Sequence, residues 1–238
     1  MDLSIIIPVW NERGKIARDA AAAAAFFRNR GIKGELIVSD DGSTDGTADA
    51  AERAGWSAGV QVKILRLPHR GKGHAVRRGM LASSGRVAGF LDSGLCIPYE
   101  DVWAGIRLIL SGQCEIAHGS RRHANSVILR PGKWTRRIAS DCFRRAASGL
   151  FRIPDGLTDT QAGCKFYSGD IARALYAACR SDGFLFDLEV IVLARKTGHR
   201  ILEFPVHWTS DPDSRLSIVR SLPNLVSESI ALMRKTRG

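Results

Sequence analysis

The sequence predicts one α/β domain built on a mainly parallel sheet with helices on its flanks. Short apolar runs rich in β-branched residues alternate with helical stretches through the first ninety residues or so, and short polar loops join them. Strands that alternate with helices in this way form βαβ units, in which the strands run parallel. Three of the apolar runs end directly in a polar cluster, and the carboxyl ends of parallel strands meet at one sheet edge. We therefore expect one polar site at that edge.

The first half of the chain carries the regular part of the pattern. Strands are expected at 3–9, 35–39, 60–65 and 86–91, and helices at 15–30, 45–54 and 74–83. The runs at 3–9 and 35–39 are apolar at successive positions, which is typical of strands covered on both faces. The polar clusters that follow the strands are Asn11-Glu12, Asp40-Asp41 and Asp92-Ser93.

The second half is less regular. We expect strands at 115–118 and 200–206, a helix at 184–196, and a polar loop at 158–166 that leads into a strand or turn. An amphipathic helix is expected at 134–151, where apolar residues recur at every fourth position, and a C-terminal helix with a basic end at 222–235. No repeat and no linker rich in Gly, Ser or Pro interrupts the chain, which favours one continuous domain over residues 1–218, followed by a basic amphipathic helix at 219–238.

Composition excludes several classes of protein. The 238 residues are 45% hydrophobic and 25% charged, which is typical of a globular chain and excludes disorder, collagen and coiled coil. The net charge is +11, and nine basic residues against the single acid Asp141 lie between residues 121 and 152. Such a cluster indicates an anionic partner. Nucleic acid is not expected, because aromatic residues are only 7% of the chain and do not alternate with the basic ones.

The cysteines and the apolar runs bear on the compartment. Five widely spaced cysteines without a CxxC pair indicate neither a zinc site nor a disulfide framework, and Cys142, Cys164 and Cys179 are expected as small core residues. No leader is visible, and the longest apolar run is too short for the roughly 20 residues that span a bilayer. We expect a cytoplasmic protein, with any membrane contact made from its surface.

Six segments in order resemble a known family. Residues 5–12 and 39–47 are similar to the opening of the family 2 glycosyltransferases with the GT-A fold. Residues 70–80, 119–121, 159–166 and 186–189 are similar to the polyprenyl-phosphate branch of that family. Each segment is weak evidence by itself, whereas their order along nearly the whole chain is specific. The resemblance implies that residues 1–118 bind a nucleotide-sugar donor and residues 119–218 face the acceptor.

The donor contacts are carried over from the family position by position. Carboxylates at strand ends are placed to accept hydrogen bonds from ribose hydroxyls and a base N–H. Gly71 and Gly73 at a helix start allow an anion to approach Lys72. The residues expected to contact the donor are Pro8, Asn11, Glu12, Asp40, Asp41, Lys72, Arg78 and Ser93.

Asp92 stands where the family holds a divalent cation, Mg²⁺ or Mn²⁺, against the donor diphosphate. Such an ion neutralises the charge that builds on the leaving nucleotide. The second acid of the family motif is replaced here by Gly94, and a further oxygen ligand is replaced by Cys96. A thiolate is a poor ligand for a hard cation. The alternatives are weak binding by Asp92 alone, help from another carboxylate, or loss of catalysis.

The acceptor side is expected to use a carboxylate and several cations. Asp159 or Asp187 would orient the sugar or the acceptor, and Gln161 belongs to the same loop as Asp159. Asp187 and Glu189 are two residues apart on a helix, so at most one should line the site. Arg121 and Arg137 are expected near an acceptor phosphate, and Arg215 near the diphosphate.

The resemblance implies an inverting glycosyltransferase that moves a hexose, glucose by similarity, from a UDP-sugar to a polyprenyl phosphate. An ionised phosphate acceptor needs positioning and charge stabilisation more than a base. Two alternatives remain at this point. One is transfer to a soluble hydroxyl acceptor, which would need a carboxylate base. The other is a nucleotide-sugar-binding protein without catalysis, which Gly94 and Cys96 would explain.

Overall fold

The computed structural model describes residues 1–60, 62–131 and 156–211. Its strands are β1 (Leu3–Val9), β2 (Gly34–Asp40), β3 (Val62–Arg66), β4 (Val87–Leu91), β5 (Ile116–Ser120), β6 (Val127–Arg130), β7 (Cys164–Ser168), β8 (Ile201–Pro205) and β9 (His207–Thr209). Its helices are α1 (Arg13–Arg30), α2 (Thr47–Ala58), α3 (Lys72–Leu81), α4 (Tyr99–Leu110), α6 (Gly169–Ala178) and α7 (Phe186–Lys196).

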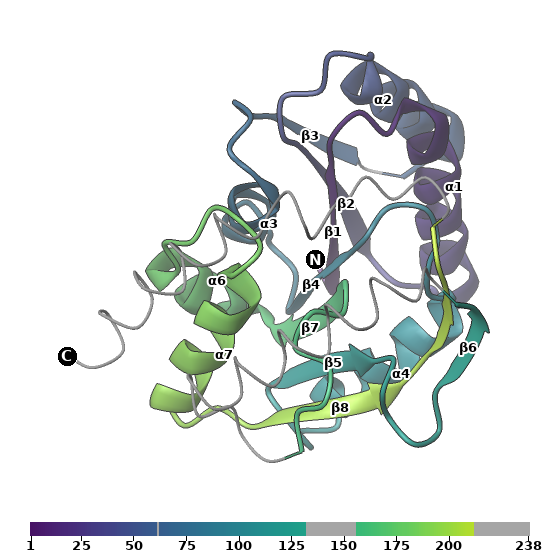
Figure 1. Cartoon of the computed structure of the whole chain (residues 1–238). Helices are drawn as coiled ribbons and strands as arrows, with labels where there is room; N and C mark the ends of the chain where they lie inside the picture. Colours follow the sequence, from purple (N-terminus) through teal and green to yellow (C-terminus); the bar gives the residue numbers. More distant parts are fainter. Residues whose placement is uncertain (61, 132–155, 212–238) are drawn as a thin grey trace.

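Seven strands form one mixed sheet in the order β3-β2-β1-β4-β7-β5-β8 (Figure 1). Only β7 runs antiparallel to its neighbours β4 and β5, and every other pairing in this sheet is parallel. The mainly parallel sheet predicted from the sequence is therefore confirmed. A second, two-stranded sheet pairs β6 with β9.

Helices cover both faces of the large sheet, because its central strands carry apolar side chains on both faces. In β1, Ile5 and Ile7 pack with residues of α1 and α4 on one face. Ile6 points the other way and packs with residues of α3, α6 and α7. Burying one such side chain contributes roughly 1.5–3 kcal/mol. The two clusters make a three-layer domain, in which strands from both halves of the chain share one sheet.

The sequence prediction missed four elements and could not be compared over two others. Helices α4 and α6 and strands β6 and β9 were not expected. The helices expected at 134–151 and 222–235, the boundary at residue 218, Cys142, and the site residues Arg137 and Arg215 all lie outside the described residues. Cys164 and Cys179 are buried core residues, as predicted. Among the helices that the structure describes, none is long and apolar enough to cross a membrane.

Candidate active site

The predicted polar clusters meet at one edge of the sheet. Strands β2, β1 and β4 are parallel neighbours, so the clusters that follow them lie together at their carboxyl ends (Figure 1). Pro8 is half-buried near the end of β1, beyond the residues that pair with β4. A residue without a backbone N–H fits there, because no β4 partner follows on that side.

Asn11 and Glu12 join the loop after β1 to the loop after β2. Asn11 has a left-handed backbone (φ 57°), which asparagine tolerates, and its Oδ1 accepts a hydrogen bond from the Thr44 amide at 2.8 Å. The Asn11 amide donates to Ser43 Oγ, and the Glu12 amide donates to Thr47 Oγ1, each at 2.8 Å. These bonds fix the two predicted donor-binding loops as one unit.

Asp40 and Asp41 are both buried and both hold backbone. Asp40 Oδ1 accepts the Ser43 amide at 2.9 Å, which closes the turn after β2. The two oxygens of Asp41 accept the amides of Arg70 (3.0 Å) and Gly71 (2.9 Å). The structure thus shows Asp41 anchoring the chain just before α3, and its predicted contact with the donor stays a prediction.

The glycines beside Lys72 allow another segment of the chain to approach closely. A Cβ on Gly71 would lie 2.7 Å from the Asp182 carbonyl oxygen, and one on Gly73 would lie 2.6 Å from the carbonyl of Gly183. The segment before α7 therefore packs directly against the start of α3. These glycines permit that contact between backbones, and the approach of an anion to Lys72 stays a prediction.

Lys72 forms an ion pair with Asp92 at the start of α3. Its Nζ lies 2.6 Å from Asp92 Oδ1 and 5.6 Å from the centre of the Phe90 ring. The Asp92 side chain is 38% exposed, so the pair lies at the surface of the site. Burial opposes ionisation of Asp92, but the positive charges of Lys72, Lys165 and Arg121 outweigh it and lower the pKa of this carboxyl. By contrast, Arg78 is exposed in the last turn of α3, so the structure does not bring it to this cluster.

Asp187 pairs with a lysine that the sequence analysis did not single out. Lys165 is fully buried on β7, and its Nζ donates to Asp187 Oδ1 and to the Ala162 carbonyl, each at 2.7 Å. Burial raises the pKa of Asp187, although the charge of Lys165 opposes the rise. Glu189 accepts the amides of Arg180 and Ser181 instead, so only Asp187 faces the site, as the spacing on the helix predicted.

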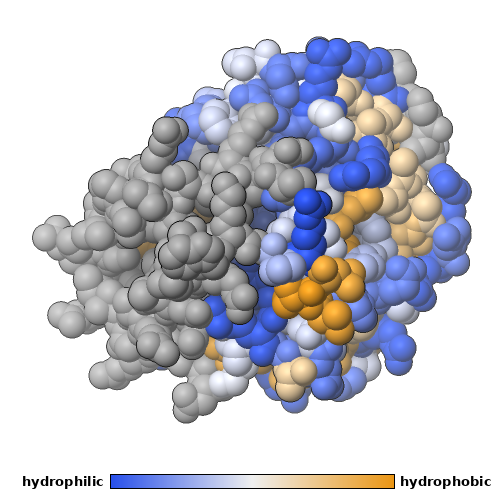
Figure 2. Space-filling model, turned by 45° about the vertical axis from the view of Figure 1, so that its right-hand side comes forward, coloured by the Kyte–Doolittle hydropathy of each residue, from blue (hydrophilic) through white to orange (hydrophobic). Residues whose placement is uncertain are grey.

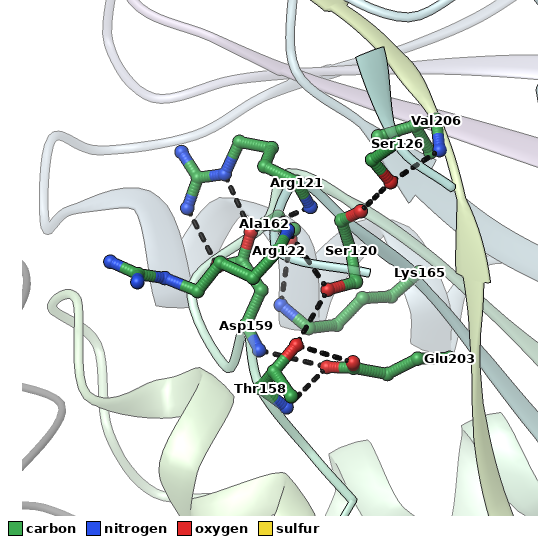
Figure 3. Close-up of polar contacts among 10 residues, drawn as sticks. All are labelled: Ser120, Arg121, Arg122, Ser126, Thr158, Asp159, Ala162, Lys165, Glu203 and Val206. Carbon is green, nitrogen blue, oxygen red and sulfur yellow. Dashed lines mark hydrogen bonds and ion pairs between the residues drawn. The ribbon is translucent and has the colours of Figure 1, made fainter. Parts of the chain in front are cut away.

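Asp159 makes the third ion pair of the site, with Arg121 (Figure 3). The Nε and Nη2 atoms of Arg121 donate to the two carboxylate oxygens of Asp159 at 2.6 and 2.7 Å, and the Arg121 amide adds a third bond at 3.0 Å. Burial opposes ionisation of Asp159, yet Arg121 outweighs it and lowers the pKa. Glu203 on β8 holds this loop by accepting the amides of Thr158 and Asp159.

Two predicted substrate contacts lie next to these pairs. Ser93 is half-buried directly after Asp92. Gln161 follows the Asp159 loop, and its amide nitrogen is buried with no hydrogen-bond partner among the described residues. A buried donor without a partner costs about 1–3 kcal/mol, so it stands out as a group that a ligand would satisfy.

Asp92 is the described carboxylate that would hold a divalent cation against the donor diphosphate. No group of three His, Cys, Asp or Glu side chains suited to a metal ion occurs in the part of the chain described. Burial raises the pKa of the Cys96 thiol to about 12, and the nearby carboxylates add to the rise, so the thiol stays protonated. Lys72 already occupies one oxygen of Asp92. A cation at Asp92 would therefore take its other ligands from donor phosphate oxygens and water, as Mg²⁺ commonly does, and the inferred cation stays a prediction.

Three ion pairs thus carry the site: Lys72–Asp92, Lys165–Asp187 and Arg121–Asp159. Each carboxylate predicted to be catalytic has a cation within 2.7 Å. Sequence reasoning missed Lys165 and Glu203, because a single charged residue inside a strand gives no local signal of its partner.

Comparisons with known proteins agree with this architecture. The sequence model of glycosyl transferase family 2 matches residues 4–176. The dolichyl-phosphate beta-glucosyltransferase of Dictyostelium discoideum is 29% identical over 90% of this chain and 68% of that protein. Glycosyltransferase AglD of Haloferax volcanii is 27% identical over 96% of this chain, which spans 36% of that longer protein.

Solved structures share the fold. Glucosyl-3-phosphoglycerate synthase from Mycobacterium tuberculosis in complex with phosphoglyceric acid aligns with a TM-score of 0.72 at 17% identity, over 99% of this chain and 79% of that one. The same enzyme with Mn²⁺, UDP-glucose and phosphoglyceric acid aligns with a TM-score of 0.70 at 18% identity, over 98% and 79%. The family model covers most of the chain, and the fold and the ordered motifs agree with it: the chain belongs to glycosyl transferase family 2 and is a glycosyltransferase with the GT-A fold.

Proposed function

We propose that this enzyme transfers a hexose, glucose by similarity to the curated relatives, from a UDP-sugar to a polyprenyl phosphate such as dolichyl phosphate, with inversion at the anomeric carbon. An oxygen of the acceptor phosphate forms a bond to the anomeric carbon. The bond from that carbon to the donor diphosphate oxygen breaks, and UDP leaves with the electron pair. No proton has to be removed, because the phosphate oxygen is already ionised near neutral pH.

One observation carries this proposal. Each of the three candidate carboxylates is held by a cation at 2.6–2.7 Å. The cations lower the pKa of Asp92 and of Asp159, so these two carboxylates are weaker bases than free ones. Burial raises the pKa of Asp187 instead, but this carboxylate is enclosed and already accepts a hydrogen bond from Lys165. A hydroxyl acceptor would need a general base, whereas an ionised phosphate needs cations that orient it. The site holds three cations, and none of its three carboxylates is free to act as a general base.

The roles of the side chains follow from their positions. Lys72, at the surface of the site beside Asp92, would bind the donor diphosphate and offset the charge that builds on leaving UDP. Arg121 would orient the acceptor phosphate, since Asp159 already fixes its guanidinium. Asp187 would hold Lys165 beneath the reacting groups. A divalent cation held by Asp92 would add to the neutralisation of the charge on the leaving diphosphate.

The experiment combines each of UDP-glucose and GDP-mannose with a short-chain polyprenyl phosphate and follows lipid-extractable hexose. We expect a lipid-linked hexose from UDP-glucose, and the β-anomer in the product. Absence of product from both donors with several lipid phosphates would refute the proposal. Donor binding without transfer or hydrolysis would instead identify a nucleotide-sugar-binding protein.

A further inference from the structure

Strand β6 presents three apolar side chains in a row to solvent. Val127, Ile128 and Leu129 are 44%, 41% and 61% exposed, and we call these three residues the β6 ridge. Figure 2, in which the side of the molecule that carries β6 is turned forward, shows a hydrophobic patch on this face. Among the exposed large apolar residues in the described part of the chain, no other three are consecutive. Contiguous exposed apolar surface marks an interaction site in a soluble fold.

The ridge is held firmly at its base (Figure 3). Ser126 Oγ donates to the Ser120 carbonyl at 2.5 Å and accepts the Val206 amide at 3.0 Å. The Val127 amide donates to the Val206 carbonyl at 3.0 Å, and β6 then pairs with β9, with Ile128 opposite Trp208. The apolar side chains are therefore presented by ordered strand backbone.

The segment of chain that carries the ridge is basic in sequence, and an acid described beside it is Asp101, which binds His207, the β9 partner of Val127. Residues 116–131 contain Arg121, Arg122, His123 and Arg130 and no acid. Over residues 121–152, which include these three arginines, the sequence has nine Lys or Arg and only Asp141 as an acid. An apolar strip flanked by positive charge complements the headgroup layer of an anionic bilayer, where apolar groups insert and cations meet phosphates.

The ridge is also connected to the candidate acceptor site. Arg121 binds Asp159 and lies 5.5 Å from the Trp208 ring, and Trp208 is the β9 residue opposite Ile128. The chain therefore passes from the predicted phosphate ligand Arg121 to the ridge within eight residues. A lipid phosphate reaching Arg121 would have its bilayer on the side of the ridge.

We propose that the β6 ridge docks this enzyme on the surface of an anionic bilayer by inserting Val127, Ile128 and Leu129 into the interfacial layer. The inference rests on the proposed function, because it makes the membrane the place where the acceptor is met. The side chains enter the interface without crossing it, and the basic residues beside them contact lipid phosphates.

The test is cosedimentation of the full chain with vesicles of phosphatidylcholine alone or with phosphatidylglycerol. The variant is the double substitution Ile128→Ser/Leu129→Ser, which changes exposed side chains only. The matched control is Leu110→Ser, because Leu110 is 53% exposed at the end of α4 and follows a different strand. We expect the double variant to lose roughly tenfold or more in affinity for the anionic vesicles, as removal of two large apolar side chains from the interface requires. The control should bind as the unchanged protein does.

Two further readouts separate this proposal from the proposed function. UDP binding should be equal in all three proteins, and transfer to a long-chain lipid phosphate in vesicles should fall with the double variant only. Equal vesicle binding by the double variant and the unchanged protein would overturn the docking surface. So would a dimer that the double substitution dissociates while vesicle binding persists, since the ridge would then hold a second copy. Ridge-dependent vesicle binding without sugar transfer would leave the docking surface standing and refute the proposed function.

Discussion

Asp19 is a buried carboxyl whose ionisation should lower the stability of the folded chain. It lies inside α1 with 1% of its surface exposed, and both its oxygens accept the Gly94 amide at 3.0–3.1 Å. Burial raises its pKa from 3.8 to about 6, although the bond from Gly94 opposes the rise. A shift of about two units corresponds to about 3 kcal/mol, at 1.36 kcal/mol per unit.

The sign follows from proton binding. Because the pKa is raised on folding, the folded chain binds the proton of Asp19 more tightly than the unfolded chain does. The contribution of this group to the free energy of unfolding is therefore largest below pH 4 and is lost as the pH rises to about 6. Asp19→Asn removes the titration, and its amide oxygen still accepts the Gly94 amide. The difference in free energy of unfolding between Asp19→Asn and the unchanged protein should therefore depend on pH. Between pH 4 and pH 7.5 it should shift in favour of the variant by about 3 kcal/mol.

The assay is urea unfolding of both proteins at pH 4, 5, 6 and 7.5. The control is Asp170→Asn, since Asp170 is almost fully exposed and only meets Arg173 on the surface. Free energies of unfolding of Asp19→Asn and the unchanged protein that stay parallel from pH 4 to 7.5 would refute the reasoning. Asp19 and Asp92 line the same small cavity. Proteins keep unfavourable buried charges mainly at functional sites, which agrees with the position of Asp19 beside the candidate active site.

The remaining predictions concern two of the three ion pairs of the site, Lys72–Asp92 and Arg121–Asp159. Lys72→Met should weaken UDP binding by roughly tenfold or more in calorimetric titration with chelator present, because it removes a positive charge from the diphosphate site; UDP binding that the substitution leaves unchanged would contradict this role. Repeating the titrations with Mn²⁺ in place of chelator measures what a cation at Asp92 adds. Gly163→Ala should abolish transfer with little loss of stability, because its Cβ would overlap the carboxylate of Asp92 and displace it; retained activity would contradict the geometry. Asp159→Asn should lower the free energy of unfolding by about 3 kcal/mol, since it leaves Arg121 without its buried partner, and an unchanged urea midpoint would contradict that.

The regular half of the fold could be predicted because its signals are local. Strands such as β1 are apolar on both faces, and each ends at a loop with its own turn residues. Strand β6 was missed because it is only four residues long, and its three apolar residues make too short a run to indicate a strand. The antiparallel direction of β7 was not foreseen either, because an apolar run fixes neither direction nor order in a sheet.

The site could be predicted where it depends on strand ends and was missed where it depends on distant pairs. The clusters after β1, β2 and β4 were expected together from topology alone, and these strands are neighbours. The pair of Lys165 with Asp187 joins a strand to a helix 22 residues later, and no local pattern marks it. The role of Asp41 could not be predicted for a different reason. A carboxylate at a strand end can bind a ligand or accept backbone amides, as Asp41 does, and the sequence does not distinguish the two.

The most direct measurement compares dolichyl phosphate with dolichol, the same lipid without its phosphate, as acceptor for glucose from UDP-glucose. We expect a glucosylated lipid from dolichyl phosphate only. Its rate of formation should vary little across the pH range in which the acceptor stays ionised, because cations at this site orient an ionised nucleophile. Glucosylation of dolichol at a comparable rate would contradict it, since that reaction needs a base. Asp92 and Asp159 are weakened as bases by their cations, and Asp187 is buried against Lys165.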